Sequence, residues 1–229
     1  MHDNLPSEWP SERIRNRLKS RGIRCFANDC VAAALLPGEL DALENELTTK
    51  LEGVLDALLI DRDQDHNTLE SARRIARMYL REVFAGRYQR MPSIAAFPNV
   101  RQLDELYVLG PIDVRSACAH HFCPIEGKLW CGVIPAGKVI GISKFARIAE
   151  WVLARPQIQE EAIVQLADVL EQELLYPLGL AVTLRAKHAC MSWRGVKQAN
   201  TLMTSSVVRG LIRENPSAKA EFLAFVNGG

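Results

Sequence analysis

Cysteine and histidine residues gather in two short segments of the chain. The first is Ser-Ala-Cys-Ala-His-His, residues 116–121, in which Cys118 and His121 are three positions apart. The second is Lys-His-Ala-Cys-Met, residues 187–191, which contributes Cys190. Two thiolates and one imidazole form a ligand set that suits zinc. Three protein ligands leave the fourth tetrahedral position open, which is typical of catalytic rather than structural zinc.

Two further histidines, His120 and His188, adjoin the candidate ligands. An open zinc site lowers the pKa of a bound water to roughly 7. Because histidine titrates near neutral pH, we interpret His120 and His188 as proton donors and acceptors. One alternative stays open at this point. His188 or Cys123 could serve as a fourth ligand, which would close the site and make the zinc structural.

Basic residues form a candidate phosphate site. Ser143-Lys144-x-x-Arg147 stands at a predicted helix start, with Ser143 as the expected N-cap. Backbone N–H groups, the helix dipole and two cations would together hold a phosphate chain there. The alternative for each residue is ordinary surface charge. Three further candidates are Arg194, which follows the second cluster, and Arg74 and Arg77 of an earlier helix. Arg81 shares the helical face of Arg74 and Arg77, and we interpret it as part of a solvated stripe.

The pair Gln159-Glu160 is a candidate purine contact at the start of another predicted helix. A buried carboxylate can accept two N–H donors at once, as the edge of guanine offers. The alternative is acidic charge that complements the helix dipole, and Glu161 fits that alternative better.

Hydrophobic periodicity predicts the elements that position these residues. In the second half of the chain the order is strand, strand, helix, helix, strand, strand, which predicts an α+β fold. We expect one antiparallel four-stranded sheet with two helices packed on one face, in a catalytic domain over residues 105–229. Residues 1–104 are predicted to be an N-terminal helical extension and a helix pair, with Thr68 as the expected N-cap of the second helix of the pair. The predicted strands cover 112–118, 126–134, 180–186 and 202–208.

Composition excludes several classes of protein. The chain has 229 residues and a net charge of +1, so neither nucleic acid nor a membrane is an expected partner. It has no run of eighteen apolar residues, and its first residues lack the pattern of a signal peptide, so we expect a cytoplasmic protein. Six cysteines in such a chain favour metal binding or burial over disulfides, and Cys131 is predicted to be a core residue.

Five motifs together resemble the GTP cyclohydrolase I family of the tunnelling-fold superfamily. They lie in the order of the family between about residues 65 and 226, well beyond a single short match. The motifs are SACAHHFCPIEGK (116–128), VIGISKFARI (139–148), RPQIQE (155–160), HACMSWRGV (188–196) and TSS (204–206).

The resemblance implies a zinc-dependent hydrolase that opens the imidazole ring of GTP at C8. Formate would leave, and 7,8-dihydroneopterin triphosphate, the first pterin of folate-type biosynthesis, would form. It also implies a homodecamer of two pentamers with active sites at subunit interfaces. The implied roles are Zn²⁺ binding by Cys118, His121 and Cys190, proton transfer by His120 and His188, guanine binding by Glu160 with Gln159, and triphosphate binding by Ser143, Lys144, Arg147, Arg194, Arg74 and Arg77.

The chain departs from the family pattern at several positions. Ala119 stands where Glu is usual, Arg77 where Lys is usual, and Ser71-Ala72 where Thr-Pro is usual. Loss of a carboxylate beside the metal could change proton handling or substrate preference. Two alternatives therefore accompany the main interpretation: a paralogue that acts on a different purine or pterin, and a non-catalytic zinc-stabilised oligomeric binding protein.

Overall fold

The computed structural model describes residues 8–228, and the chain divides into two compact units, Met1–Arg90 and Met91–Gly229. The predicted domains, 1–104 and 105–229, differ from these units by the segment 91–104. That segment belongs to the second unit, in which β1 (Ala96–Pro98) pairs antiparallel with β4 (Lys138–Ile140). The N-terminal residues used for the signal-peptide prediction lie outside the described residues.

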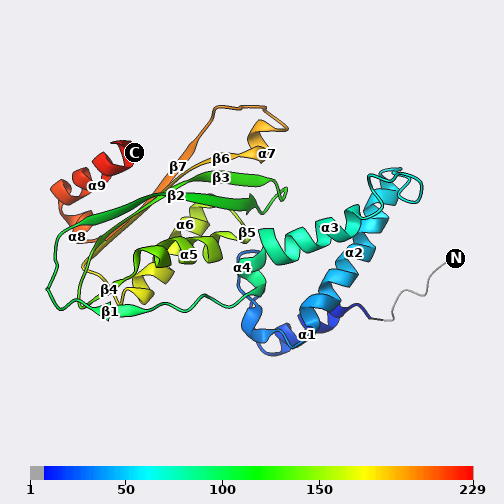
Figure 1. Ribbon diagram of the computed structural model, residues 1–229, viewed down its shortest axis with the longest axis horizontal. Coiled ribbons are helices and arrows are strands. Elements are labelled where there is room, and N and C mark those ends of the chain that lie inside the picture. Colours follow the sequence, from blue (N-terminus) through cyan, green and yellow to red (C-terminus); the bar gives the residue numbers. More distant parts are fainter. Residues whose placement is uncertain (1–7, 229) are drawn as a thin grey trace. The chain divides into compact units, whose positions relative to one another are not determined.

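The N-terminal unit is helical (Figure 1). Its small core is formed by Ile14 and Leu18 of α1 together with Val31, and Leu43 of α2 packs against it. Helices α2 and α3 contact each other, as the predicted helix pair requires. The elements of this unit are α1 (Pro10–Ser20), η1 (Ala32–Ala34), α2 (Glu39–Ala57), α3 (Ser71–Arg77), η2 (Met78–Val83) and α4 (Ala85–Tyr88).

Arg81 does not belong to a solvated stripe with Arg74 and Arg77, as its spacing had indicated. The helix changes from α to π geometry at η2, and the wider turn alters the direction of the side chains that follow. The Arg81 guanidinium donates to Glu44 Oε2 at 2.7 Å and also to Asp41, both on α2. Arg74 and Arg77 are exposed. Arg81 thus joins the two helices.

Two predicted helix caps are wrong. Thr68 does not cap α3, because its hydroxyl bonds the Asp65 carboxylate at 3.2 Å and the helix begins only at Ser71, with no side-chain cap. Ser143 does not cap α5 (Ile142–Leu153) either. The preceding strand ends so close to the helix that Gly141 takes the N-cap position, and Ser143 lies inside the first turn.

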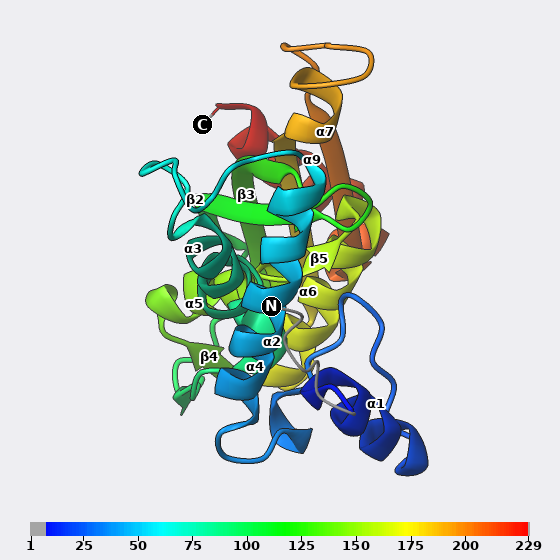
Figure 2. The same ribbon diagram turned by 90° about the vertical axis from the view of Figure 1, so that its right-hand side faces the viewer.

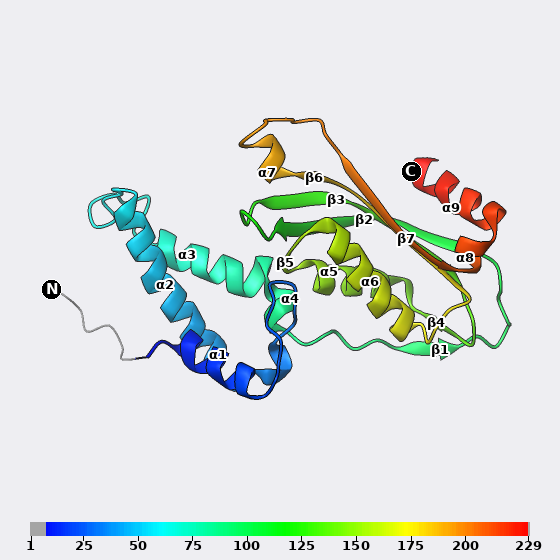
Figure 3. The ribbon, with the colours of Figure 1, turned by 180° about the vertical axis from the view of Figure 1, so that it is seen from behind.

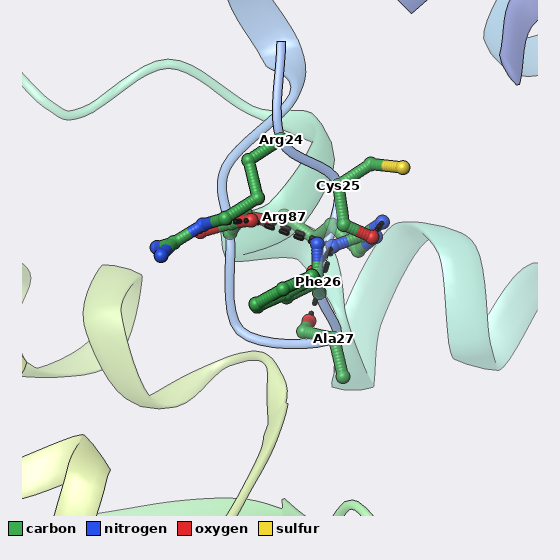
Figure 4. A network of polar contacts seen from close by, with 6 residues as sticks. Arg24, Cys25, Phe26, Ala27 and Arg87 are labelled. Atoms are coloured by element: carbon green, nitrogen blue, oxygen red, sulfur yellow. Dashed lines mark hydrogen bonds and ion pairs between the residues drawn. The ribbon is translucent and has the colours of Figure 1, made fainter. Parts of the chain in front are cut away.

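Arg87 of α4 holds the loop that precedes η1 (Figure 4). Its guanidinium donates hydrogen bonds to carbonyl oxygens at 3.2 Å (Cys25), 3.1 Å (Ala27) and 2.9 Å (Asp29), and also to that of Phe26. A planar guanidinium with five donors suits this convergence, whereas a lysine could not reproduce it. A single side chain therefore fixes the backbone of residues 25–29.

We expect Arg87→Met to lower the free energy of unfolding of the N-terminal unit by about 1–3 kcal/mol, because four carbonyl groups lose a charged donor. The loop should become a site of rapid cleavage in limited proteolysis, with urea unfolding giving the change in stability. Arg73→Met removes an exposed arginine from α3 and is the matched control. Equal stability and equal cleavage in the two variants would contradict the assignment.

The C-terminal unit is built on a five-stranded sheet, one strand more than predicted. The order is β5-β2-β3-β6-β7, and every neighbouring pair is antiparallel except β5 with β2. The additional strand is only two residues long, which is why hydrophobic periodicity did not reveal it. The strands are β2 (Tyr107–Cys118), β3 (Pro124–Ile134), β5 (Pro156–Gln157), β6 (Gly179–His188) and β7 (Met203–Gly210).

Helices cover both faces of this sheet (Figure 3). Alternate residues of β3 face opposite layers, as the two-residue period of a strand requires. Leu129 and Cys131 lie in the core with α5 and α6 (Gln159–Glu173), whereas Trp130 packs with Phe222 beneath α8 (Leu211–Glu214) and α9 (Pro216–Gly228). The structure confirms Cys131 as a core residue, and burial raises the pKa of its thiol to about 12.

The α+β class is confirmed, whereas the tunnelling fold stays a prediction. A helix pair, α5 and α6, lies on one face as expected, but α8 and α9 on the other face were not anticipated as a second layer. Within residues 8–228, none of the helices has the length and apolar character needed to cross a membrane.

Candidate active site

The two cysteine and histidine segments meet at one end of the sheet. Cys118 is the last residue of β2, and His188 is the last residue of β6. Strand β3 lies between them and pairs with both, with Ile125 opposite His188. A short helix, α7 (Ala189–Ser192), follows β6 directly and carries Cys190 (Figure 2).

A tight turn joins β2 to β3 and presents the first segment. The N–H of Cys118 donates to the carbonyl oxygen of Cys123 at 2.9 Å, and the N–H of Phe122 returns to Cys118 at 2.8 Å. Strand β5 supports the turn from the other side, where the N–H of Ala119 donates to the carbonyl oxygen of Gln157 at 3.1 Å. Backbone bonds therefore fix the loop on which His120 and His121 stand.

The predicted metal ligands converge. The ligand atoms of Cys118, His121 and Cys190 all lie within 4.8 Å of one another. Tetrahedral zinc bonds of about 2.0–2.3 Å require separations of roughly 3.3–3.8 Å, so a small contraction would seat one ion. Cys118 is buried, Cys190 half-buried and His121 exposed, so the cluster opens to solvent on the histidine side. Two thiol sulfurs and one imidazole, open to solvent on one side, are a donor set that fits zinc.

Cys123 takes no part in this cluster. Its sulfur is buried and lies 3.8 Å from the carbonyl oxygen of His121. Cys123 is instead a neighbour whose thiol affects the pKa of Cys190. Burial raises the pKa of the Cys190 thiol, and the nearby Cys118 and Cys123 raise it further. A divalent cation between the sulfurs would reverse that direction, because it favours the thiolate.

His188 is held by Gln159, the first residue of α6. The ring nitrogen Nε2 of His188 lies 2.8 Å from Oε1 of Gln159. Burial lowers the pKa of His188, and the carboxylate of Glu160 partly offsets this effect. The surroundings of the ring therefore favour the neutral imidazole.

The other predicted residues near the cluster are exposed. His120 lies beside Cys118, with Nδ1 3.7 Å from the sulfur. Arg194 donates from Nη1 to Nε2 of His121 at 3.0 Å, so the arginine reaches a candidate ligand directly. Glu160 follows Gln159 and is exposed. The single chain therefore does not bury the carboxylate that was predicted to contact guanine.

The predicted phosphate residues of α5 are not brought to the cluster within one chain. Ser143 and Lys144 occupy the first turn of α5, next to β4, whereas the other end of this helix leads to β5 and Cys118 (Figure 1). A helix of twelve residues is about 18 Å long. Arg147 is one turn closer and exposed. Arg74 and Arg77 belong to the N-terminal unit, and their role stays a prediction.

Supporting residues escaped the sequence interpretation. Gln157 was noted only within the motif RPQIQE, although its backbone anchors the metal loop. Ser205 accepts a hydrogen bond from Gln159 at 2.9 Å and was noted only within a motif. Its signal in the sequence is the run of three hydroxyl residues, 204–206, within β7.

Comparison with known families now identifies the chain. The family model "GTP cyclohydrolase I" matches residues 47–227, and the chain belongs to this family. It is an enzyme of the GTP cyclohydrolase type, so the non-catalytic alternative is set aside.

Curated relatives agree with this assignment. GTP cyclohydrolase 1 of Vibrio vulnificus (strain YJ016) is 33% identical over 216 residues, covering 93% of this chain and 95% of the relative. The protein of the same name from Salmonella choleraesuis is 35% identical over 193 residues, covering 82% and 86%. That of Rhodopirellula baltica is 36% identical over 174 residues, covering 76% and 75%.

A solved structure, the archaeosine synthase QueF-Like in the apo form, covers 53% of this chain and 97% of its own. Its TM-score of 0.36 and 16% identity are too low to bear on the fold.

We expect the wild-type protein to bind about one zinc ion per chain, and Cys118→Ser and Cys190→Ser to weaken that binding by more than about 100-fold, beyond the loss typical of outer-shell changes. Equilibrium dialysis with elemental analysis measures this. Cys123→Ser should retain zinc, and Cys25→Ser is the exposed control. Zinc loss in Cys123→Ser equal to that in Cys118→Ser would show a closed, four-ligand site instead.

Proposed function

We propose that this protein is a zinc-dependent GTP cyclohydrolase I that opens the imidazole ring of GTP at C8, releases formate and forms 7,8-dihydroneopterin triphosphate. The observation that carries the proposal is the convergence of Cys118, His121 and Cys190 at the end of the sheet. Family membership supplies the reaction class, and the donor set supplies the reason for a metal.

The proposed roles follow from the environment of each residue. Zinc held by Cys118, His121 and Cys190 would act as a Lewis acid and activate water at neutral pH. His188, half-buried in surroundings that favour its neutral form, is suited to accept a proton, while the exposed His120 is open to solvent. Glu160, close enough to influence His188, would accept the N–H groups of the guanine edge.

The triphosphate would be held by basic side chains together with the N-terminal end of helix α5. Arg194 is in place beside His121 in one chain. Ser143, Lys144 and Arg147 lie toward the end of α5 that is remote from Cys118, and we propose that they serve a site in another copy of the chain. This separation supports active sites shared between subunits, as a homodecamer of two pentamers would provide. Arg74 and Arg77 are proposed to complete the phosphate site.

A second candidate function rests on Ala119. The turn from Cys118 to Cys123 contains no carboxylate, because alanine occupies the position where the family usually has Glu. A paralogue that acts on a different purine or pterin would share the zinc site and the general acid–base residues. The two functions differ only in substrate, so a panel of nucleotides separates them.

We expect zinc-loaded protein to release formate and a fluorescent pterin from GTP. His188→Ala and His120→Ala should each lower kcat by about 10²–10⁴-fold, since each removes a proton-transfer group. His66→Ala, which removes an exposed histidine of the N-terminal unit, is the control. Formate release and pterin fluorescence are measured with zinc content held equal. Turnover of another purine without turnover of GTP would favour the paralogue.

Shared active sites predict complementation between two inactive variants. Cys190→Ser lacks the metal and Lys144→Ala lacks a phosphate contact, so each alone should be nearly inactive. After dissociation and joint reassembly in equal amounts, about one quarter of the sites should combine intact residues from two subunits. GTP turnover of the mixture, compared with each variant reassembled alone, measures this. A mixture no more active than its parts would show that Cys190 and Lys144 do not act together across a subunit interface.

A further inference from the structure

Gln159 forms an unusually complete set of contacts for one side chain at the site. Its amide nitrogen Nε2 lies 3.0 Å from the carbonyl oxygen of Leu184 on β6 and 3.2 Å from that of Met203 on β7. Ser205 Oγ is 2.9 Å from the same nitrogen. On the other side of the amide, Oε1 faces the ring of His188 at 2.8 Å. We infer that Gln159 is a positioning residue that fixes the proton of His188 on Nε2 and leaves Nδ1 as the only proton acceptor of the ring.

The orientation of the amide follows from its neighbours. Carbonyl oxygens such as those of Leu184 and Met203 only accept hydrogen bonds. If the amide of Gln159 were turned over, its oxygen would face both of them without a hydrogen between. The nitrogen therefore points to the two strands, and the oxygen points to His188. The hydrogen-bonding capacity of these partners, and not the positions of Oε1 and Nε2 alone, determines the orientation of the amide.

The position of the proton on His188 follows in turn. The amide oxygen of Gln159 has no hydrogen to donate, so the contact of 2.8 Å requires a hydrogen on Nε2. A neutral imidazole carries one hydrogen, and hence Nδ1 holds the free lone pair. A doubly protonated ring would also keep Nε2–H. In both states Nε2 stays protonated, and any proton that His188 exchanges passes through Nδ1.

Gln159 is also locked in place. Its side chain is buried, with the residue only 2% exposed, and its partners lie on two strands that pair with each other. Rotation would leave the buried amide of Gln159 without its partners, which costs about 1–3 kcal/mol. Because both N–H donors of the buried amide are engaged by the two strands, Gln159 has no donor left for a purine. The predicted contact with guanine thus falls to Glu160 alone.

The consequence for the reaction rests on the proposed function. A histidine that takes a proton must present its lone pair to the reacting group, and in serine proteases the wrong tautomer costs about 10⁴-fold. By fixing Nε2–H, Gln159 would keep neutral His188 in the tautomer whose Nδ1 can accept a proton. Gln159 then contributes to kcat without touching the substrate.

Neutron diffraction from deuterated crystals of the zinc-loaded protein tests the inference without any assay of turnover. Density for a deuteron on Nε2 of His188, pointing to Oε1 of Gln159, is the expected result. A deuteron on Nδ1 with a bare Nε2 would overturn the inference, even if the protein converts GTP. The expected result in a protein inactive on GTP would leave the inference standing and refute the proposed function.

Kinetics provide a second measurement. Gln159→Met keeps the length of the side chain but removes both polar groups, and we expect kcat for the true substrate to fall at least about tenfold with KM nearly unchanged. Gln172→Met, an exposed change in the same helix, is the matched control. A rise in KM with kcat unchanged would instead show that Gln159 binds the purine. If Gln159→Met loses zinc or fails to fold, the neutron result on the wild type decides.

Discussion

The register of β3 against β6 is the constraint on which the rest of the structure depends. The pairing runs without interruption from Ile125 opposite His188 to Ile134 opposite Gly179. Because side chains alternate between faces, a slip of one residue would move the apolar set of β6 out of the core. The same slip would carry Cys190 away from Cys118. Burial of apolar side chains along the sheet therefore determines the geometry of the metal ligands at its end.

The polar part of the site is fixed by the same strands. Burying an amide without partners is costly, and Gln159 avoids that cost by bonding β6, β7 and His188 together. A fully satisfied buried network rigidifies its members. The exposed residues His120, His121 and Arg194 stand in contrast on the solvent side, where ligands and water can reach them. The site thus combines a rigid inner half with an accessible outer half.

Local sequence predicted the parts of this arrangement that depend on local patterns. Apolar periodicity indicated the long helices and four strands, and the unusual Cys-x-His-His and His-x-Cys spacings indicated which side chains would meet. Contacts between residues distant in sequence could not be predicted in this way. The two residues of β5 are too few to show a period, and the hydrogen bonds of Gln159 depend on backbone groups of two strands. Arg81 was misassigned because the change to π geometry has no periodic signature. Ser143 was misassigned as a cap because the end of β4 and not side-chain chemistry sets the start of α5.

The short strand β5 also bears on how such chains can diverge. Only a few residues separate the end of α5 at Leu153 from the start of α6 at Gln159, and Pro156 and Gln157 among them pair with Ala117 and Cys118. An insertion or deletion there would shift the carbonyl of Gln157 away from the N–H of Ala119 and turn Gln159 off its helical face. Length changes during evolution should therefore accumulate in exposed segments such as 197–202 and be purged from this connection, whose length is as much a part of the catalyst as its residues.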